Sequence, residues 1–151
     1  MNNLLKTLIL FVLISYWPVS SWATSHEELN ERNYFQFVIP EYHTTRQSGQ
    51  TLDVYVRYAY KPGLPTSEYP DYRLLRTRIL KYMEPSEELP AEVFWEIIAT
   101  SMGRELMHDF PLTGVSVQLY VHDNQNPDSF EPGDHGPTFT AGDITPLDIH
   151  H

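Results

Sequence analysis

Cysteine is absent from the 151-residue sequence. The chain therefore forms no disulfide bond, has no thiolate nucleophile or thiolate metal ligand, and has no cysteine that a lipid could modify. Basic residues are scarce as well, since 10 Lys and Arg stand against 20 Asp and Glu, which gives a formal net charge of -10. Nucleic acids and anionic membranes bind clustered positive charge, so this composition argues against both as partners.

The sequence also lacks an N-terminal apolar run long enough to span a membrane. The stretch from Leu8 to Ile14 is apolar, but Pro18 and two serines follow it, and a spanning helix needs about 20 apolar residues. Lys6 precedes this stretch, and Ser21 and Ala23 flank Trp22 in the small-x-small pattern of a signal-peptidase site. These three zones predict a cleavable secretory signal over residues 1–23 and a periplasmic or extracellular location, with no stable membrane anchor.

Cleavage after Ala23 leaves 128 residues, and the loss of Lys6 moves the net charge to -11. That length suits one small domain. We expect a polar leader over 24–33, a single domain over 34–141 and a tail over 142–151. Without disulfides, an exported domain of this size depends on packing or oligomerisation for its stability.

Four segments have the patterns of β-strands. Residues 34–39 are aromatic and β-branched and end at Pro40, and residues 51–60 alternate apolar and polar side chains with a period of two. Gly49 lies in the polar link between them, which favours an antiparallel hairpin. The alternation returns in 115–122, and 137–141 is a candidate for a short last strand. The proline-containing stretches 61–70 and 123–134 are expected to be loops.

Two helices are predicted between the second and third strands. Asp71 stands at an N-cap position before Leu75 and Ile79, and Pro85 follows. Pro90 is expected to open a second, longer helix that ends at Pro111. The order strand, strand, helix, helix, strand, strand predicts an α+β domain, with an antiparallel sheet and two helices on one face.

This order resembles the tunnelling fold, shared by dihydroneopterin aldolase, GTP cyclohydrolase I, pyruvoyltetrahydropterin synthase and urate oxidase. The resemblance covers roughly residues 34–141. The run from Trp95 to Ala99 is similar to the aldolase segment in which a glutamate precedes a helical apolar run. In that family the glutamate binds the amino-pyrimidine edge of the pterin, which implies this role for Glu96. The alternative is that Glu96 is a solvated residue on an amphipathic helix.

The candidate ligand-binding residues are Glu96, Trp95, Tyr72 and His122. Tyr72 ends a Tyr-Pro-Asp-Tyr turn near the ligand-facing end of the second strand, where it is a candidate pocket wall. His122 follows the third strand, where the aldolases carry a catalytic lysine in a His-Lys-Pro-like stretch. Because that lysine is missing, the resemblance implies no aldolase activity, and no catalytic residue is assigned.

Metal sites and cofactors are not expected. The zinc-dependent relatives use grouped histidines or a cysteine, whereas the histidines here are scattered. The acidic loop around 122–135 has no EF-hand spacing.

The resulting prediction is an exported homo-oligomer that binds a pterin-like or purine-like heterocycle. In the family, pockets lie between subunits, and a short sheet with free edges closes most readily when several copies join into a barrel. Two alternatives stay open. One is a structural or protein-interaction module without a small-molecule ligand, and the other is a divergent enzyme resembling dihydroneopterin aldolase.

Overall fold

The computed structural model describes residues 33–123 and 133–149. The predicted signal peptide lies outside these residues, as do nearly all of the predicted leader and much of the 123–134 loop. Among the helices that are described, none combines the length and the apolar character needed to cross a bilayer.

A four-stranded antiparallel sheet forms the scaffold. Its strands are β1 (Phe35–Thr44), β2 (Gln50–Tyr60), β3 (Leu112–Val121) and β4 (Thr138–Gly142), and their order in the sheet follows the chain. The alternation seen in the sequence sets the register, because apolar residues of β2 and β3 face each other in pairs such as Val54 with Leu119.

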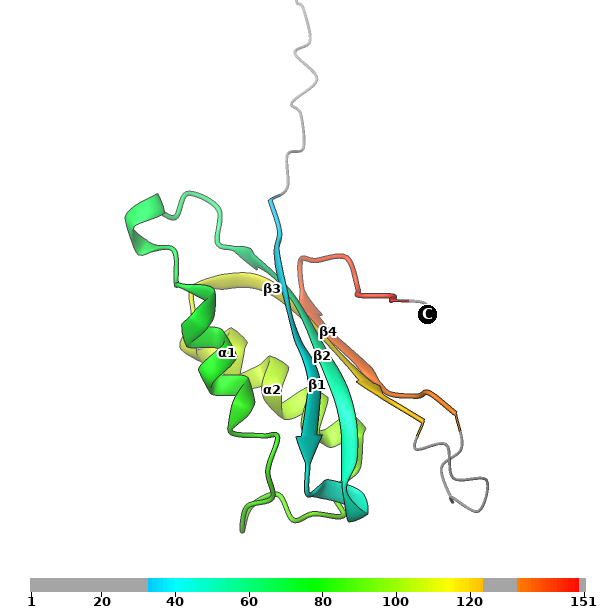
Figure 1. Cartoon of the computed structure of the whole chain (residues 1–151). Helices are drawn as coiled ribbons and strands as arrows, with labels where there is room; N and C mark the ends of the chain where they lie inside the picture. The colour runs from blue at the N-terminus through cyan, green and yellow to red at the C-terminus, as the bar shows by residue number, and fades with distance from the viewer. Residues whose placement is uncertain (1–32, 124–132, 150–151) are drawn as a thin grey trace, which may run out of the picture. The chain divides into compact units, whose positions relative to one another are not determined.

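Two helices cover one face of the sheet, α1 (Tyr72–Leu80) and α2 (Trp95–Asp109) (Figure 1). Ile98 and Met102 of α2 are fully buried in the same core as Val56 and Val117 of the central strands. Gly103 allows the close approach of α2 to β4, since a Cβ there would lie 2.3 Å from the ring of Phe139. The predicted fold class, an antiparallel sheet with two helices on one face, is confirmed.

The first strand extends beyond the position predicted for its end. It continues through Pro40 to Thr44, and its register with β2 shifts between Ile39 and Tyr42. Glu41 lies at this shift with a positive φ of 48°. A β-bulge tolerates a proline because the ladder is already interrupted there.

The second helix begins at Trp95 rather than at Pro90. The reason is a competition for the carbonyl groups that a helix starting at Pro90 would use. Arg46 Nη1 donates to the carbonyls of Leu89 and Pro90, and the main-chain N–H of Gln47 donates to the carbonyl of Ala91.

Residues 143–149, placed in the predicted tail, pack against the sheet. Ile144 and Leu147 are 8% and 4% exposed. Arg57 donates to the carbonyls of Thr145 and Pro146, and the Leu147 amide donates to Ser116 Oγ over 2.9 Å. Arg57 and Ser116 alternate with core residues, so this segment covers the face of the sheet opposite the helices.

Candidate functional site

A cavity of about 400 Å³ lies at the start of α2. Three segments far apart in sequence line it: Gln47 of the β1–β2 turn, Phe94 to Glu96, and His135 to Pro137 before β4. The last segment is fixed by main-chain hydrogen bonds to the end of β3, including Leu119 N to Pro137 O. The volume is within the usual range for small-molecule sites.

The first turn of α2 presents main-chain donors without partners. Phe94 occupies the N-cap position, and its apolar side chain supplies no capping hydrogen bond. Within 33–123 and 133–149, no group accepts a hydrogen bond from the main-chain N–H of Trp95 or Glu96. Free N–H groups at the start of a helix, together with the helix dipole, favour an electronegative ligand atom.

Trp95 adds a further donor beside the cavity. Its side chain is 5% exposed, and its Nε1 atom is buried with no hydrogen-bond partner in the described part of the chain. A buried indole N–H ordinarily finds an acceptor, because leaving it unpaired costs about 1–3 kcal/mol. Trp95 therefore combines a flat apolar wall with an unsatisfied polar atom.

Glu96 places an acceptor next to these donors. The residue is exposed and lines the cavity, and its carboxylate has no ion pair or hydrogen bond with the residues that the structure describes. The first turn of α2 thus offers main-chain donors and a free carboxylate from consecutive residues.

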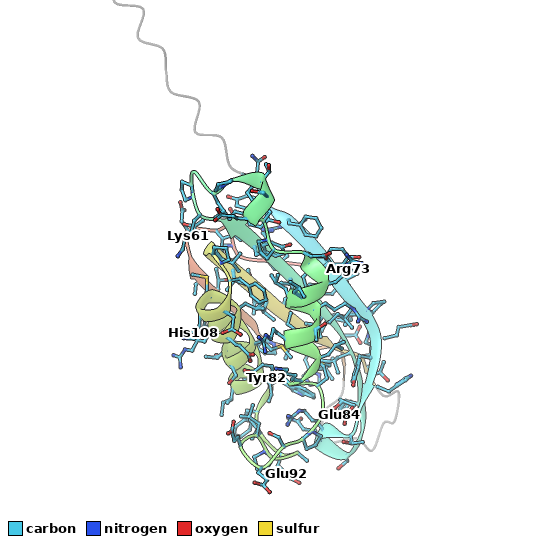
Figure 2. The ribbon with its side chains drawn as sticks, turned by 90° about the vertical axis from the view of Figure 1, so that its left-hand side faces the viewer. Lys61, Arg73, Tyr82, Glu84, Glu92 and His108 are labelled. Carbon is cyan, nitrogen blue, oxygen red and sulfur yellow. The ribbon has the colours of Figure 1, made fainter. Side chains whose placement is uncertain are left out.

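A buried arginine fixes the loop that leads into α2. Arg46 is 0% exposed and donates to four main-chain carbonyls, those of Tyr82, Glu84, Leu89 and Pro90. Burial lowers the pKa of its guanidinium, and the nearby Glu84 carboxylate opposes this effect. Figure 2 shows this loop running from Tyr82 past Glu84, with Glu92 at its far end.

Gln47, the residue after Arg46, is held by the same loop before α2. Its main-chain N–H donates to Ala91 O over 3.2 Å, and its side-chain Nε2 donates to Val93 O over 3.2 Å. Gln47 has a left-handed backbone, with φ 47° and ψ 48°. No sequence pattern marks this residue, because its neighbours in the cavity are more than 40 positions away.

Tyr72 lies in a separate aromatic cluster at the start of α1. Its ring stacks on Phe35 with centroids 5.5 Å apart, and Tyr60 stacks on Tyr69 at 4.0 Å. A hollow of about 440 Å³ runs along this cluster, and Tyr58 and Arg73 contribute to its walls. Within one copy of the chain, Tyr72 and Glu96 do not line the same cavity.

His122 lies just beyond β3 and pairs with Asp53, with 3.1 Å between Nε2 and Oδ1. Burial acts to raise the pKa of Asp53, but hydrogen bonds from the Glu41 amide and the Tyr55 hydroxyl, together with the nearby His122 ring, lower it overall. His122 is not among the residues that line the cavity beside Glu96. Of the four sequence candidates, the structure brings together Glu96 and Trp95.

Lysine is absent from the lining of this cavity. Lys61 and Lys81 are the lysines of the described ranges, and neither contributes to the walls. Figure 2 places Lys61 at the opposite end of the domain from Glu92, which precedes α2. In the same ranges, no group of three or more His, Asp or Glu side chains is arranged to hold a metal ion.

The structure is similar to solved dihydroneopterin aldolases. One from Burkholderia, bound to guanine, has a TM-score of 0.55 and 13% identity, and the match covers 79% of this chain and 98% of that one. The Escherichia coli enzyme in complex with neopterin has a TM-score of 0.51 and 12% identity, covering 72% and 99%. A putative dihydroneopterin aldolase from Vibrio cholerae has a TM-score of 0.50 and 12% identity, covering 72% and 97%.

No family model matches the sequence. No curated protein matches it either. The structural matches show that the chain has the tunnelling fold, and the predicted resemblance is confirmed at that level.

Proposed function

We propose that the cavity at the start of α2 binds a flat heterocycle whose edge carries a carbonyl, a ring N–H and an amino group in that order. This is the edge of pterins and of guanine. The observation that carries the proposal is the free carboxylate of Glu96 beside the free main-chain donors of Trp95 and Glu96.

The chemistry of the two edges is complementary. The ligand carbonyl accepts from the helix N–H groups, and the ring N–H and amino group donate in parallel to the two oxygens of Glu96. Such bidentate, charge-assisted pairs are stronger and more selective than neutral hydrogen bonds. The indole of Trp95 and the exposed ring of Phe94 supply apolar surface against the flat ring. Guanine and neopterin, bound by the two aldolases named above, both carry this edge.

We further propose that a second copy of the chain completes the pocket. The cavity is open, and the aromatic cluster around Tyr72 of a second copy adds a stacking surface to the one that Trp95 and Phe94 supply. β1 and β4 are the outer strands of the sheet, so each has an edge that no described strand pairs, and edges of this kind join copies into larger sheets. The proposed assembly is a homo-oligomer with sites between subunits.

We propose a binding function without aldolase activity, exercised outside the cytoplasm. The absence of lysine from the cavity walls supports the first part, and the predicted signal over residues 1–23 supports the second. Purified protein incubated with dihydroneopterin is expected to release no glycolaldehyde. Release of glycolaldehyde would favour the divergent-enzyme alternative instead.

The binding test compares Glu96→Gln with a matched control, Glu92→Gln. Both glutamates are exposed and lie near the start of α2, but only Glu96 lines the cavity. Neopterin and guanine are expected to raise the melting temperature of the unmodified protein and of Glu92→Gln. In Glu96→Gln, the loss of a charge-assisted pair of about 2–3 kcal/mol is expected to weaken binding roughly 30- to 150-fold.

Calorimetry would give the affinities that check this expectation. If neither ligand bound the unmodified protein, the proposal would fail and the structural-module alternative would be favoured. If Glu96→Gln and Glu92→Gln bound equally well, the ligand would occupy another site.

A further inference from the structure

We infer that Gln47 is a specificity-determining residue of this site, and that it selects ligands with a hydrogen-bond donor away from the edge held by Glu96. This inference rests on the proposed function. It assigns to the β1–β2 turn a role that the sequence did not indicate. It also narrows the ligand class, from any heterocycle with the carbonyl, ring N–H and amino edge to one that carries a further hydrogen-bond donor elsewhere.

The orientation of the Gln47 side chain is chemically fixed. A carbonyl oxygen only accepts hydrogen bonds, so the amide group that meets Val93 O at 3.2 Å has to present Nε2. The other half of the amide, Oε1, accepts no hydrogen bond from the described residues. Gln47 therefore brings one oriented, unoccupied acceptor to the wall of the cavity.

The backbone that carries this side chain is strained and tightly held. Gln47 and Ser48 both have positive φ, 47° and 68°, before Gly49 at 92°. Left-handed residues other than glycine are uncommon and cost free energy, and they gather at functional sites. The hydrogen bond from Gln47 N to Ala91 O and the burial of Arg46 keep the turn in place.

Fixed acceptors discriminate strongly between ligands. Glu96 and Gln47 both offer oxygen atoms, and they reach the cavity from the helix and from the turn. A ligand with a donor within reach of Gln47 pairs with Oε1 after both groups lose their water. A ligand without that donor leaves Oε1 buried and unpaired, which costs about 1–3 kcal/mol. The donor is either a hydroxyl on a ring substituent or a ring N–H.

Two pairs of ligands distinguish a hydroxyl donor from a ring N–H donor. Neopterin carries hydroxyl groups that 6-methylpterin lacks, and guanine carries a ring N–H that 9-methylguanine lacks. We expect the unmodified protein to prefer the donor-bearing member of at least one pair by about 5- to 150-fold, as the cost of an unpaired acceptor predicts. Which pair shows the preference identifies the kind of donor.

The variants are Gln47→Met, which keeps the length of the side chain without its acceptor, and Gln47→Glu, which keeps an acceptor. Ser48→Ala is the control, since Ser48 shares the left-handed turn but is exposed and does not line the cavity. Gln47→Met is expected to lower the affinity for the donor-bearing ligand to the affinity for the ligand of the same pair that lacks the donor. Ser48→Ala is expected to keep the preference. Gln47→Glu is expected to keep part of it, because its carboxylate accepts hydrogen bonds but has no N–H to donate to Val93 O.

Calorimetric affinities for all four ligands decide the outcome, with thermal unfolding to show that each variant is folded. The inference is overturned if the preference persists in Gln47→Met, or if the unmodified protein binds both members of both pairs equally. Either result leaves the proposed function intact as long as Glu96→Gln still weakens the binding of neopterin and guanine by the factor given above. Failure of every ligand to bind the unmodified protein refutes both proposals.

Discussion

The two helices begin in opposite ways, although they lie side by side on the same sheet. α1 starts behind Asp71, whose carboxylate accepts a hydrogen bond from the Arg73 amide over 2.9 Å. α2 starts behind Phe94, which caps nothing and is 70% exposed. One helix start is satisfied within the chain, and the other leaves its donors free of partners among the described residues.

Under the proposed function, this difference separates a helix start that serves stability from one that serves binding. A helix start without a cap costs about 0.5–2 kcal/mol relative to one with a good N-cap residue. At α2 that cost coincides with a cavity, a buried unpaired indole N–H and a strained turn. Departures from local rules that gather in one place are typical of sites that bind something.

The largest expected effect comes from Arg46, which holds the loop before α2. Arg46→Met would remove four hydrogen bonds made by a fully buried side chain, so we expect the free energy of unfolding to fall by at least about 3 kcal/mol. Urea denaturation measures the change. Arg46→Lys keeps the charge but not the five donors of the guanidinium, and its loss is expected to be intermediate. A loss below about 1 kcal/mol would show that the loop holds its shape without this residue.

A smaller effect is expected when α2 is given the cap that α1 has. Phe94→Ser adds an acceptor for the free N–H groups, and Phe94→Ala removes the ring without adding one. Relative to Phe94→Ala, we expect Phe94→Ser to raise the free energy of unfolding by about 0.5–2 kcal/mol. Phe94→Ser is also expected to bind neopterin or guanine about tenfold more weakly than Phe94→Ala does, because the serine hydroxyl competes with the ligand for the main-chain N–H groups of α2.

Chemical denaturation and calorimetry check the two expectations separately. Greater stability with unchanged affinity would mean that the ligand does not use the helix donors. Ligand binding would then not explain why α2, unlike α1, lacks an N-cap.

Local patterns predicted the scaffold well. The alternation in β2 and β3 fixed both the strands and the face that is buried, and Asp71 marked the start of α1. The start of α2 was predicted too early because Arg46, more than 40 residues away, takes the carbonyls of Leu89 and Pro90. The end of β1 was misplaced because a bulge absorbs Pro40. Both misplacements involve features that no short window of sequence contains.

The candidate site was accessible to sequence reasoning only in part. Glu96 and Trp95 were chosen because the run from Trp95 to Ala99 resembles the aldolase segment, and they do line the cavity. Gln47 was missed because it reaches the site through long-range hydrogen bonds to Ala91 and Val93. Tyr72 and His122 were grouped with Glu96 through the family resemblance, and in one chain they lie at other places.

The smallest expected effect concerns the capped helix, where only stability should change. The side chain and amide of Arg73 hydrogen-bond to Asp71 and lower the pKa of this carboxyl from 3.8 to about 2. A carboxyl whose pKa is lowered on folding stabilises the protein above its unfolded pKa, and this contribution is lost as the pH falls toward the folded value. Asp71→Asn removes the charge but keeps a capping oxygen.

We therefore expect Asp71→Asn to melt slightly below the unmodified protein at pH 7 and at the same temperature near pH 2. Thermal unfolding across this pH range measures the difference. Ligand affinity at pH 7 should match that of the unmodified protein, because Asp71 does not line the cavity beside Glu96. A loss of affinity in this variant would link the start of α1 to binding, as expected if a second copy brings its aromatic cluster to the pocket.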